Sequence, residues 1–402
     1  MLLTRWLWCT IAALLTVPAA VSAAAPFLPV PEIDVDPNSG TTVGLLPIWI
    51  RTDEQHAVRR IIAPDVIYNP YFGYGARARV FAFPSADTQW SVVGGGKQRV
   101  EREFDAIYET GRLRNTKWSA LLEAVLDRSG TPRFYGIGNR SPAIDQTDYT
   151  NQQMYLHAHV GRNINRALQW SYTLRVRGVE VTPGSLAHIA SLNQRFGNIL
   201  GAGVNQEVLN RLAATFDTRD DATVPTTGFL LSAYAGFAAR HGFLNASLYS
   251  AAGLDAHAYW MLAADVSLAG HVSLRYLPTT HHTPFWALSS LGGASSELEG
   301  SQPLRGFGTS RFYGRNAFST SWELRCTVAK FDAVGTHIDL QLTPFADAGR
   351  VFARAGTSPL SQLHYVGGLG VRAVARPTVV GYLDVGYGSE GIAVFTGINY
   401  PI

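Results

Sequence analysis

Long stretches in which apolar and polar residues strictly alternate are the feature that most limits how this chain can fold. Between residues 262 and 276, the even positions are apolar, aromatic or glycine, and most odd positions are polar or charged. The same period of two recurs over 154–162, 170–177, 321–328 and 337–343. Successive side chains of a strand point to opposite faces, so this period predicts long β-strands with one apolar and one polar face.

The predicted strands are expected to cross a membrane. A soluble β-sandwich also alternates, but its strands are shorter and its outer face is polar. Here one face carries apolar and aromatic groups and the other carries charges and small residues, as in a barrel with a lipid-facing exterior and a polar lumen. Trp170, Trp260, Tyr276 and Tyr400 lie near strand ends, where an interfacial aromatic girdle is expected.

Composition excludes other classes of protein. Charged residues make up 16% of the 402 residues and aromatic residues 11%, whereas a disordered chain has many charges and few aromatics. The net charge of +3 is too small to indicate binding of nucleic acid. After the N-terminal segment, no apolar run of about 18 residues occurs, which excludes a helical membrane bundle.

Residues 1–23 are interpreted as a cleaved signal peptide. Arg5 precedes an apolar run of about 12 residues, and small residues before Ala23 fit a cleavage site. Cys9 would be lost with this peptide, which leaves Cys326 without a partner for a disulfide. The proline-containing segment 24–42 is expected to be a short periplasmic lead-in, and 43–402 the barrel. Export of such a chain predicts the outer membrane of a Gram-negative cell.

The pattern predicts an all-β fold, a sixteen-stranded antiparallel transmembrane barrel. The strands are expected at 43–50, 71–83, 87–96, 99–110, 117–128, 149–162, 167–181, 207–217, 226–239, 243–254, 257–276, 315–329, 336–352, 362–375, 378–387 and 390–402. Connections after even-numbered strands are short, and several after odd-numbered strands are long. The long ones, 51–70, 129–148, 182–206 and 277–314, are expected at the cell surface.

Short motifs in the second half of the chain occur in a recognisable order. Leu304-Arg305-Gly306-Phe307 lies late in the longest loop, Trp322-Glu323-Leu324-Arg325 follows on the next strand, and Phe345-Ala346-Asp347-Ala348-Gly349 on the one after. Phe216-Asp217-Thr218-Arg219-Asp220 precedes them. Together they resemble the bacterial surface antigen family of outer-membrane assembly factors, over nearly all of the chain after the signal peptide.

The resemblance implies a sixteen-stranded barrel whose sixth surface loop folds back into the lumen. It assigns Asp217, Arg219, Phe345 and Gly349 to family motifs. Gly397, Tyr400 and Ile402 fit the family's C-terminal insertion signal, although the sequence ends in Ile402 and not in an aromatic residue. Pro401 has no N–H and is expected to weaken pairing at the strand that closes the barrel. A second departure is that no periplasmic polypeptide-binding module is expected before the barrel, as in the barrel-only branch of the family.

A specific contact is expected to hold the sixth loop in place. Arg305 can engage a carboxylate with two parallel hydrogen bonds, and Asp347 and Glu323 share the polar face of the neighbouring strands. We expect Arg305 to reach one or both of them, with Gly306 allowing a tight turn and Phe307 packed against the wall. Charges of both signs recur on that face, namely Arg77, Arg79, Asp105, Arg175, Arg177, Asp265, Arg275, Glu323, Arg325, Asp339, Asp347, Arg372 and Asp384.

The predicted role is the assembly, insertion or translocation of polypeptides or other envelope components. The alternatives are a passive, porin-like diffusion channel and a structural barrel that presents surface loops. No enzyme activity, cofactor or metal is expected: His281 and His282 point apart on an extended chain, and His157 and His159 fit a polar network. Expected partners are membrane lipids, the barrel-assembly machinery during insertion and a separate periplasmic protein that supplies polypeptide-binding modules, with the barrel itself a monomer.

Overall fold

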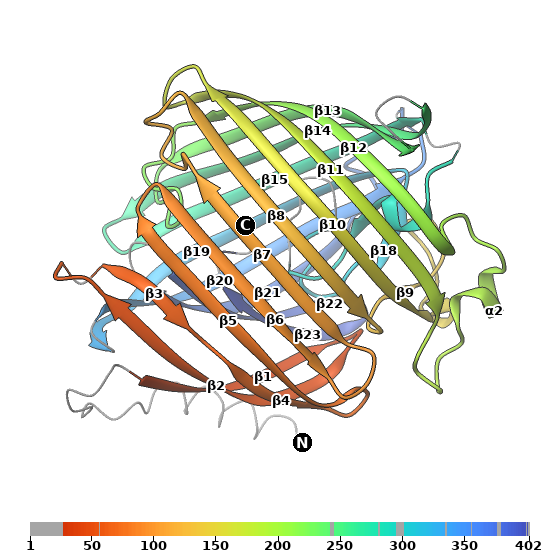
Figure 1. Ribbon diagram of the computed structural model, residues 1–402, viewed down its shortest axis with the longest axis horizontal. Coiled ribbons are helices and arrows are strands. Elements are labelled where there is room, and N and C mark those ends of the chain that lie inside the picture. The colour runs from red at the N-terminus through yellow and green to blue at the C-terminus, as the bar shows by residue number, and fades with distance from the viewer. Residues whose placement is uncertain are drawn as a thin grey trace.

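The computed structural model describes residues 27–398 and 400, except 56, 242–244, 280–281, 295–300, 334–335, 355 and 376–378. Its main element is one antiparallel sheet that closes on itself as a barrel (Figure 1). No helix within the described ranges is long and apolar enough to span a membrane. The predicted signal peptide 1–23, His281 and Ile402 lie outside the described residues.

The ring contains eighteen strand positions in the part of the chain that is described, and β3 and β4 share one position because both pair with β2 and β5. The first half runs β1 (Phe27–Asp36), β2 (Gly40–Thr52), β3 (Val58–Ile62) with β4 (Asp65–Asn69), β5 (Gly73–Ser85), β6 (Thr88–Lys97), β7 (Arg102–Thr110), β8 (Trp118–Ser129), β10 (Thr147–Asn163) and β11 (Leu168–Pro183). The second half runs β12 (Gly203–Asp217), β13 (Gly228–His241), β14 (Asn245–Ala263), β15 (Val266–Thr279), β19 (Asn316–Ala333), β20 (Thr336–Phe352), β21 (His364–Ala375), β22 (Val379–Gly388) and β23 (Gly391–Ile398).

The closed antiparallel barrel agrees with the prediction, but the predicted number of sixteen strands is wrong. The two additional positions are β1, within the expected lead-in 24–42, and β3 with β4, within the expected loop 51–70. Pro29 and Pro31 argue against a strand from sequence, because proline cannot donate a ladder hydrogen bond. Pro64 divides the other segment into two five-residue pieces, too short for alternation to identify. The loop 280–315 is consequently the seventh connection at its end of the barrel rather than the sixth.

The predicted strand 257–276 is also corrected, because it contains the turn between β14 and β15 at residues 264–265. Met261 pairs with Ser267 but Ala263 pairs with Val266, so a β-bulge precedes the turn. The bulge adds one residue to β14, so that even-numbered residues lie on the same face of the sheet before and after the turn. The alternation in the sequence therefore continues through the turn and hides it.

The two faces of the sheet have opposite character. On β19, Trp322 is 42% exposed, whereas the neighbouring Glu323 is fully buried. Exposed apolar side chains at alternate positions occur on most strands, including Leu122, Leu156, Trp170, Leu212, Phe229, Leu254, Trp260, Leu342 and Leu369. We call these two sides the apolar face and the polar face. Exposed apolar groups in this number suit contact with lipid and not with water.

The long connections gather at one end of the barrel and pack on one another. This end holds residues 130–146, 184–202, 280–315 and 353–363, with β9 (Arg133–Phe134), η1 (Ala143–Asp145), α2 (Leu192–Phe196), η2 (Phe285–Ala287) and the small sheet of β16 (Ser289–Leu291), β17 (Ser301–Gln302) and β18 (Phe312–Gly314). Phe134 is the centre of their contact, with ring centroids 5.0 Å from Phe285 and 5.3 Å from Tyr313. These aromatic contacts join loops that are far apart in sequence into one cap.

At the other end, the turn 218–227 between β12 and β13 reaches across the ring. Val224 is buried against Val374 of β21 and Val380 of β22. Arg112, which follows β7, donates a hydrogen bond from Nη2 to Thr223 Oγ1 at 3.3 Å. Because the turn contacts strands on both sides of its own hairpin, it lies across this mouth of the barrel.

The topology predicts that the two ends are exposed on opposite sides of the membrane. Single cysteines at Ile144, which is 80% exposed at the long-loop end, and at Ile164, which is 56% exposed at the other end, are tested with Cys326→Ser in the background. A bulky membrane-impermeant maleimide added to whole cells should label position 144 only, and position 164 should react after the cells are broken. Labelling of both positions on whole cells would contradict the topology.

Candidate functional site

In the loop 280–315, the side chain of Arg305 makes four hydrogen bonds to three carboxylates. It is fully buried and donates from Nε and Nη2 to the two carboxylate oxygens of Asp347, at 2.9 and 2.7 Å. Its Nη1 bonds Glu323 Oε1 at 2.5 Å and Asp384 Oδ2 at 3.1 Å. The expected pairing with Asp347 and Glu323 is thus present in the contacts, and Asp384 of β22 is a third acceptor that we had not assigned to this arginine.

The charges around Arg305 balance within the polar face of β19–β22. Arg372 bonds Glu323 at 3.0 Å and also bonds Asp384, and Arg325 bonds Glu323 at 3.1 Å. Three arginines therefore face three carboxylates, and each of the six residues is at most 2% exposed. Burial alone would lower the pKa of Arg305, but Asp347, Glu323 and Asp384 raise it well above its ordinary value. The arginine therefore stays charged, and its positive charge compensates the buried carboxylates around it.

Glycines allow the loop backbone to lie directly against the barrel wall. A Cβ at Gly386 would lie 2.0 Å from the carbonyl oxygen of Arg305, and one at Gly306 would lie 2.6 Å from the amide nitrogen of Gly388. Any side chain at these positions would push the loop away from β22. The chain does turn tightly here, with the Phe307 amide donating to the Leu304 carbonyl at 3.0 Å, and Gly306 also permits this close approach.

Phe307 anchors the apolar side of the same segment. It is 1% exposed and packs with Leu291, Leu304, Phe312 and Phe345 in one core cluster. Its ring centroid is 5.2 Å from that of Phe312. The Phe345 ring also lies under the Arg305 guanidinium, 3.7 Å away, in cation–π geometry. The segment thus combines an ionic contact and an apolar one on the same wall.

Two further contacts connect this segment, residues 301–314, to the strands where the ring closes. The Asn38 amide, in the β1–β2 turn, donates to the Thr309 carbonyl at 2.8 Å. Arg311 bonds both carboxylate oxygens of Glu390, in the β22–β23 turn, and lies 3.9 Å from the Tyr135 ring. Sequence spacing gave no sign of these contacts, because each joins segments that are distant along the chain.

The ring closes through a short junction between β1 and β23, which we call the seam. Val35 and Val394 are the one register pair between these strands in the described residues. β1 pairs with β2 over its whole length, Phe27 to Asp36, and β23 pairs with β22 from Gly391 to Ile398. The seam therefore contains far fewer ladder hydrogen bonds than the junctions beside it.

The remaining family-motif residues lie apart from Arg305. Asp217 accepts hydrogen bonds from Arg219 Nε at 3.0 Å and Nη2 at 2.9 Å, which orders the start of the turn 218–227. Gly349 lies on β20, where a Cβ would come 3.2 Å from Leu291 of the loop. These positions shape the turn and the loop approach, and nothing in their geometry adds a reactive group.

The residues of the predicted C-terminal insertion signal have different surroundings. Gly397 lies on β23 opposite Tyr382. Tyr400 does not take the girdle position expected of it, because its hydroxyl donates to Gln341 at 2.9 Å and its ring stacks on Arg325 at 3.6 Å on the polar face. Ile402 lies outside the described residues.

Comparison with known proteins agrees with the fold and confirms the family that the motifs indicated. Residues 93–374 match the Omp85 superfamily domain, and no curated protein sequence matches the chain. BamA from Haemophilus ducreyi, in a structure lacking POTRA domains 1–3, is similar with 12% identity and a TM-score of 0.51 over 92% of this chain and 74% of that one. At this identity, the likeness shows the fold alone.

Two CdiB structures are similar at lower scores. CdiB from Escherichia coli has 10% identity and a TM-score of 0.48 over 95% of this chain and 63% of that chain. CdiB from Acinetobacter baumannii has 12% identity and a TM-score of 0.45 over 93% and 59%. This chain therefore spans less than two thirds of either CdiB chain. The domain match covers well over half of the sequence, and the chain belongs to the Omp85 superfamily of outer-membrane β-barrels.

Proposed function

We propose that this barrel assists the insertion or translocation of polypeptides at the outer membrane, and that its seam opens sideways to do so. The observation that carries the proposal is that Val35 and Val394 form the single register pair between β1 and β23 in the part of the chain that is described. Opening this junction breaks few hydrogen bonds, and it frees one edge of β1 and one edge of β23. An unpaired strand edge can accept an incoming strand by β-augmentation.

Proline accounts for the weakness of the seam. β1 carries Pro29 and Pro31, which have no N–H to donate, so the strand cannot make a complete ladder on both of its edges. Such a strand is suited to an edge that pairs transiently. The other junctions of the ring are paired over more residues and are expected to remain closed during function.

The segment 301–314 would control this opening. We propose that the polar face lines the lumen and that Arg305 holds the segment inside it. The segment then contacts both sides of the seam. Its Thr309 accepts a hydrogen bond from Asn38 in the β1–β2 turn, and its Arg311 bonds Glu390 in the β22–β23 turn. Release of the segment would remove contacts from both edges at once, which couples the loop to the seam.

Other parts of the functional assignment are proposals of the same kind. Residues 1–23 would direct export and be cleaved after Ala23. The barrel would act as a monomer, be inserted by the barrel-assembly machinery, and receive clients from a periplasmic protein with polypeptide-binding modules. We propose no enzymatic role.

Reversible locking of the seam tests the proposal. Val35→Cys with Val394→Cys, in a Cys326→Ser background, places two thiols at directly opposed positions within disulfide reach. Proteoliposomes with the oxidised variant should fold an added unfolded eight-stranded outer-membrane barrel no faster than empty liposomes. A reductant should restore the rate, measured by the appearance of the heat-modifiable band on gels.

The chain provides a matched control, because Val394 also pairs with Val385 on β22. Val385→Cys with Val394→Cys locks a hairpin that is already fully paired, so client folding should continue under oxidation. If the locked seam and the locked hairpin behave alike, opening at the seam is not the route. A wide and steady pore in the unmodified protein would instead favour the passive channel.

A further inference from the structure

Three metal-ligating side chains converge on the polar face of β14 and β15, away from Arg305. His257 Nε2 lies 2.8 Å from Asp255 Oδ1, and His271 Nε2 lies 2.9 Å from Asp255 Oδ2. The two imidazole rings stack with their centroids 4.3 Å apart, and one ligand atom from each of the three residues lies within 4.8 Å of the others. Sequence analysis did not single out this group, because the turn that pairs the two strands is hidden by the bulge.

The cluster has a charge that its own members do not balance. His271 is fully buried, and the side chains of Asp255 and His257 are 10% and 15% exposed. Within the described residues, the ion pairs of Asp255 are with the two histidines only. With both imidazoles neutral, a nearly buried carboxylate remains without a cation, which is costly. A cation placed between the three ligand atoms would remove that cost.

The ligand set selects the class of cation. Two imidazole nitrogens and one carboxylate oxygen are typical of Zn²⁺ sites with three protein ligands and one open position. Oxygen-only ligands would instead suit Mg²⁺ or Ca²⁺. Around a tetrahedral zinc with bonds of about 2.0 Å, neighbouring ligand atoms lie roughly 3.3 Å apart. The two nitrogen–oxygen distances of 2.8 and 2.9 Å would widen slightly, and the remaining separations, which are at most 4.8 Å, would close to this value through side-chain rotations.

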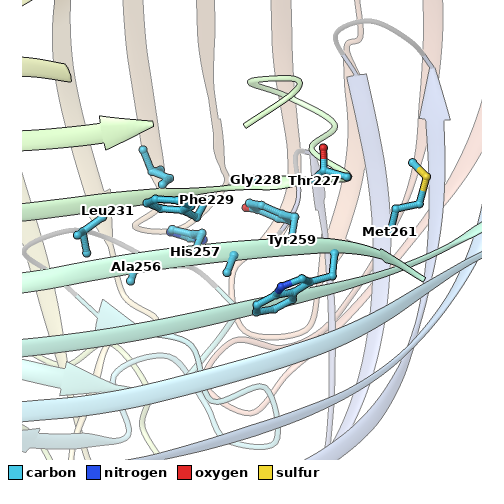
Figure 2. A pocket seen from close by; sticks show the side chains of 11 residues that line it. Thr227, Gly228, Phe229, Leu231, Ala256, His257, Tyr259 and Met261 are labelled. Atoms are coloured by element: carbon cyan, nitrogen blue, oxygen red, sulfur yellow. The ribbon is translucent and has the colours of Figure 1, made fainter. Parts of the chain in front are cut away.

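The surroundings offer both an open position and an outer partner. His257 and Tyr259 line a cavity of about 490 Å³ at the mouth crossed by the turn 218–227. Figure 2 shows the two side chains next to each other on β14, where they also line a second pocket with Gly228 and Phe229. On the buried side, His271 Nδ1 has no hydrogen-bond partner. Ser321, opposite His271 in register, has a buried hydroxyl that also has none. When Nε2 binds a metal, Nδ1 carries a proton. The Ser321 hydroxyl on the neighbouring strand could then accept a hydrogen bond from Nδ1, directly or through one water.

We propose that Asp255, His257 and His271 bind one divalent transition-metal ion, Zn²⁺, whose fourth position opens to the cavity beside Tyr259. The inference is independent of the proposed function at the seam, because none of these residues contacts β1, β23 or the segment 301–314 through a hydrogen bond or ion pair in the described residues. It assigns the polar face a binding site in addition to its structural ion pairs.

Metal titration of the purified full chain tests the proposal. Tag-free protein in detergent, stripped with EDTA, should take up one equivalent of Zn²⁺ in competition with a chromogenic chelator. Co²⁺ in its place should give the intense visible absorption of a tetrahedral site. Asp255→Asn, His257→Gln and His271→Gln should each weaken binding by about 100-fold or more, since loss of an outer partner alone costs 10–100-fold.

His157→Gln is the matched control, because His157 also bonds a carboxylate, Glu123, at 3.0 Å from a strand of the same ring. This variant should bind Zn²⁺ as the unmodified protein does. His257→Gln carries the test if the fully buried His271 cannot be replaced without loss of folding, as judged by heat-modifiable mobility. Absence of stoichiometric Zn²⁺ uptake, or equal affinity in folded His257→Gln, would overturn the assignment.

Discussion

Arg305→Ala is expected to lower the free energy of unfolding of the barrel by about 3–5 kcal/mol, the usual cost of removing one partner from a buried ion pair. The change leaves Asp347, Glu323 and Asp384 facing only Arg325 and Arg372, in a region that water does not reach. It also removes the guanidinium that packs on Phe345. Urea titration of protein in lipid vesicles, followed by heat-modifiable mobility on gels, measures the loss.

A double-mutant cycle identifies the pair responsible. Asp347→Ala alone should be similarly destabilising, because it leaves Arg305 without its two-bond partner. The double variant should cost little more than either single change, since the interaction is lost once. The free energy of unfolding of Arg305→Lys should lie between those of the unmodified protein and Arg305→Ala, because lysine keeps the charge but cannot form the two parallel bonds to Asp347.

Arg195→Ala is the control for the effect of burial. Arg195 also bonds an aspartate, Asp145, but the side chains are 39% and 31% exposed. Surface ion pairs contribute about 0–1 kcal/mol, so this variant should unfold almost as the unmodified protein does. Full additivity of Arg305→Ala and Asp347→Ala, or equal losses for Arg305→Ala and Arg195→Ala, would refute the role of the buried network.

The second large effect is expected in ion conduction. A ring of sixteen to eighteen strands is wide enough for an aqueous channel, yet the segment 301–314 and the turn 218–227 would obstruct it at successive depths. Two obstructions in series allow only the current that the narrower one permits. Replacing residues 303–311 or residues 221–226 with a short Gly-rich link should each raise the conductance in planar bilayers modestly, and both together should raise it several-fold more than the sum.

Shortening the connection at residues 356–360, in the exposed loop between β20 and β21, provides the control. This loop belongs to the same end of the barrel but contributes no contact to Arg305, so its loss should leave the small conductance unchanged. A large conductance in the unmodified protein, or none in the doubly shortened one, would show that these two segments do not obstruct the lumen.

Sequence reasoning succeeded where one physical rule dominates. Alternation located most of the strands from β5 onward, because a wall between lipid and a polar interior imposes a period of two on each strand. The need of a buried arginine for carboxylates on a known face was enough to connect Arg305 with Asp347 and Glu323.

It failed where neighbours outside the local sequence decide the structure. Pro29 and Pro31 are compatible with a strand only because β1 has a weakly paired edge, and that edge exists only once the ring has closed. Asp384 also bonds Arg305, but it lies on β22, and the sequence around it does not indicate how close β22 comes to the loop. Asp255 and His271 meet because a bulge and a two-residue turn bring their strands into register.

The turn 218–227 has a consequence for the order in which the barrel can be completed. Its contact with Arg112 joins residues 111 positions apart, and its contact with Val374 and Val380 involves strands near the end of the chain. Contacts of such long sequence separation form slowly. Because the turn lies within the circle of strands that surrounds it, the last hairpins must come to rest on it as they join the ring. We therefore expect the packing of β21 and β22 on Val224 to accompany the last step of closure, in which β23 reaches β1.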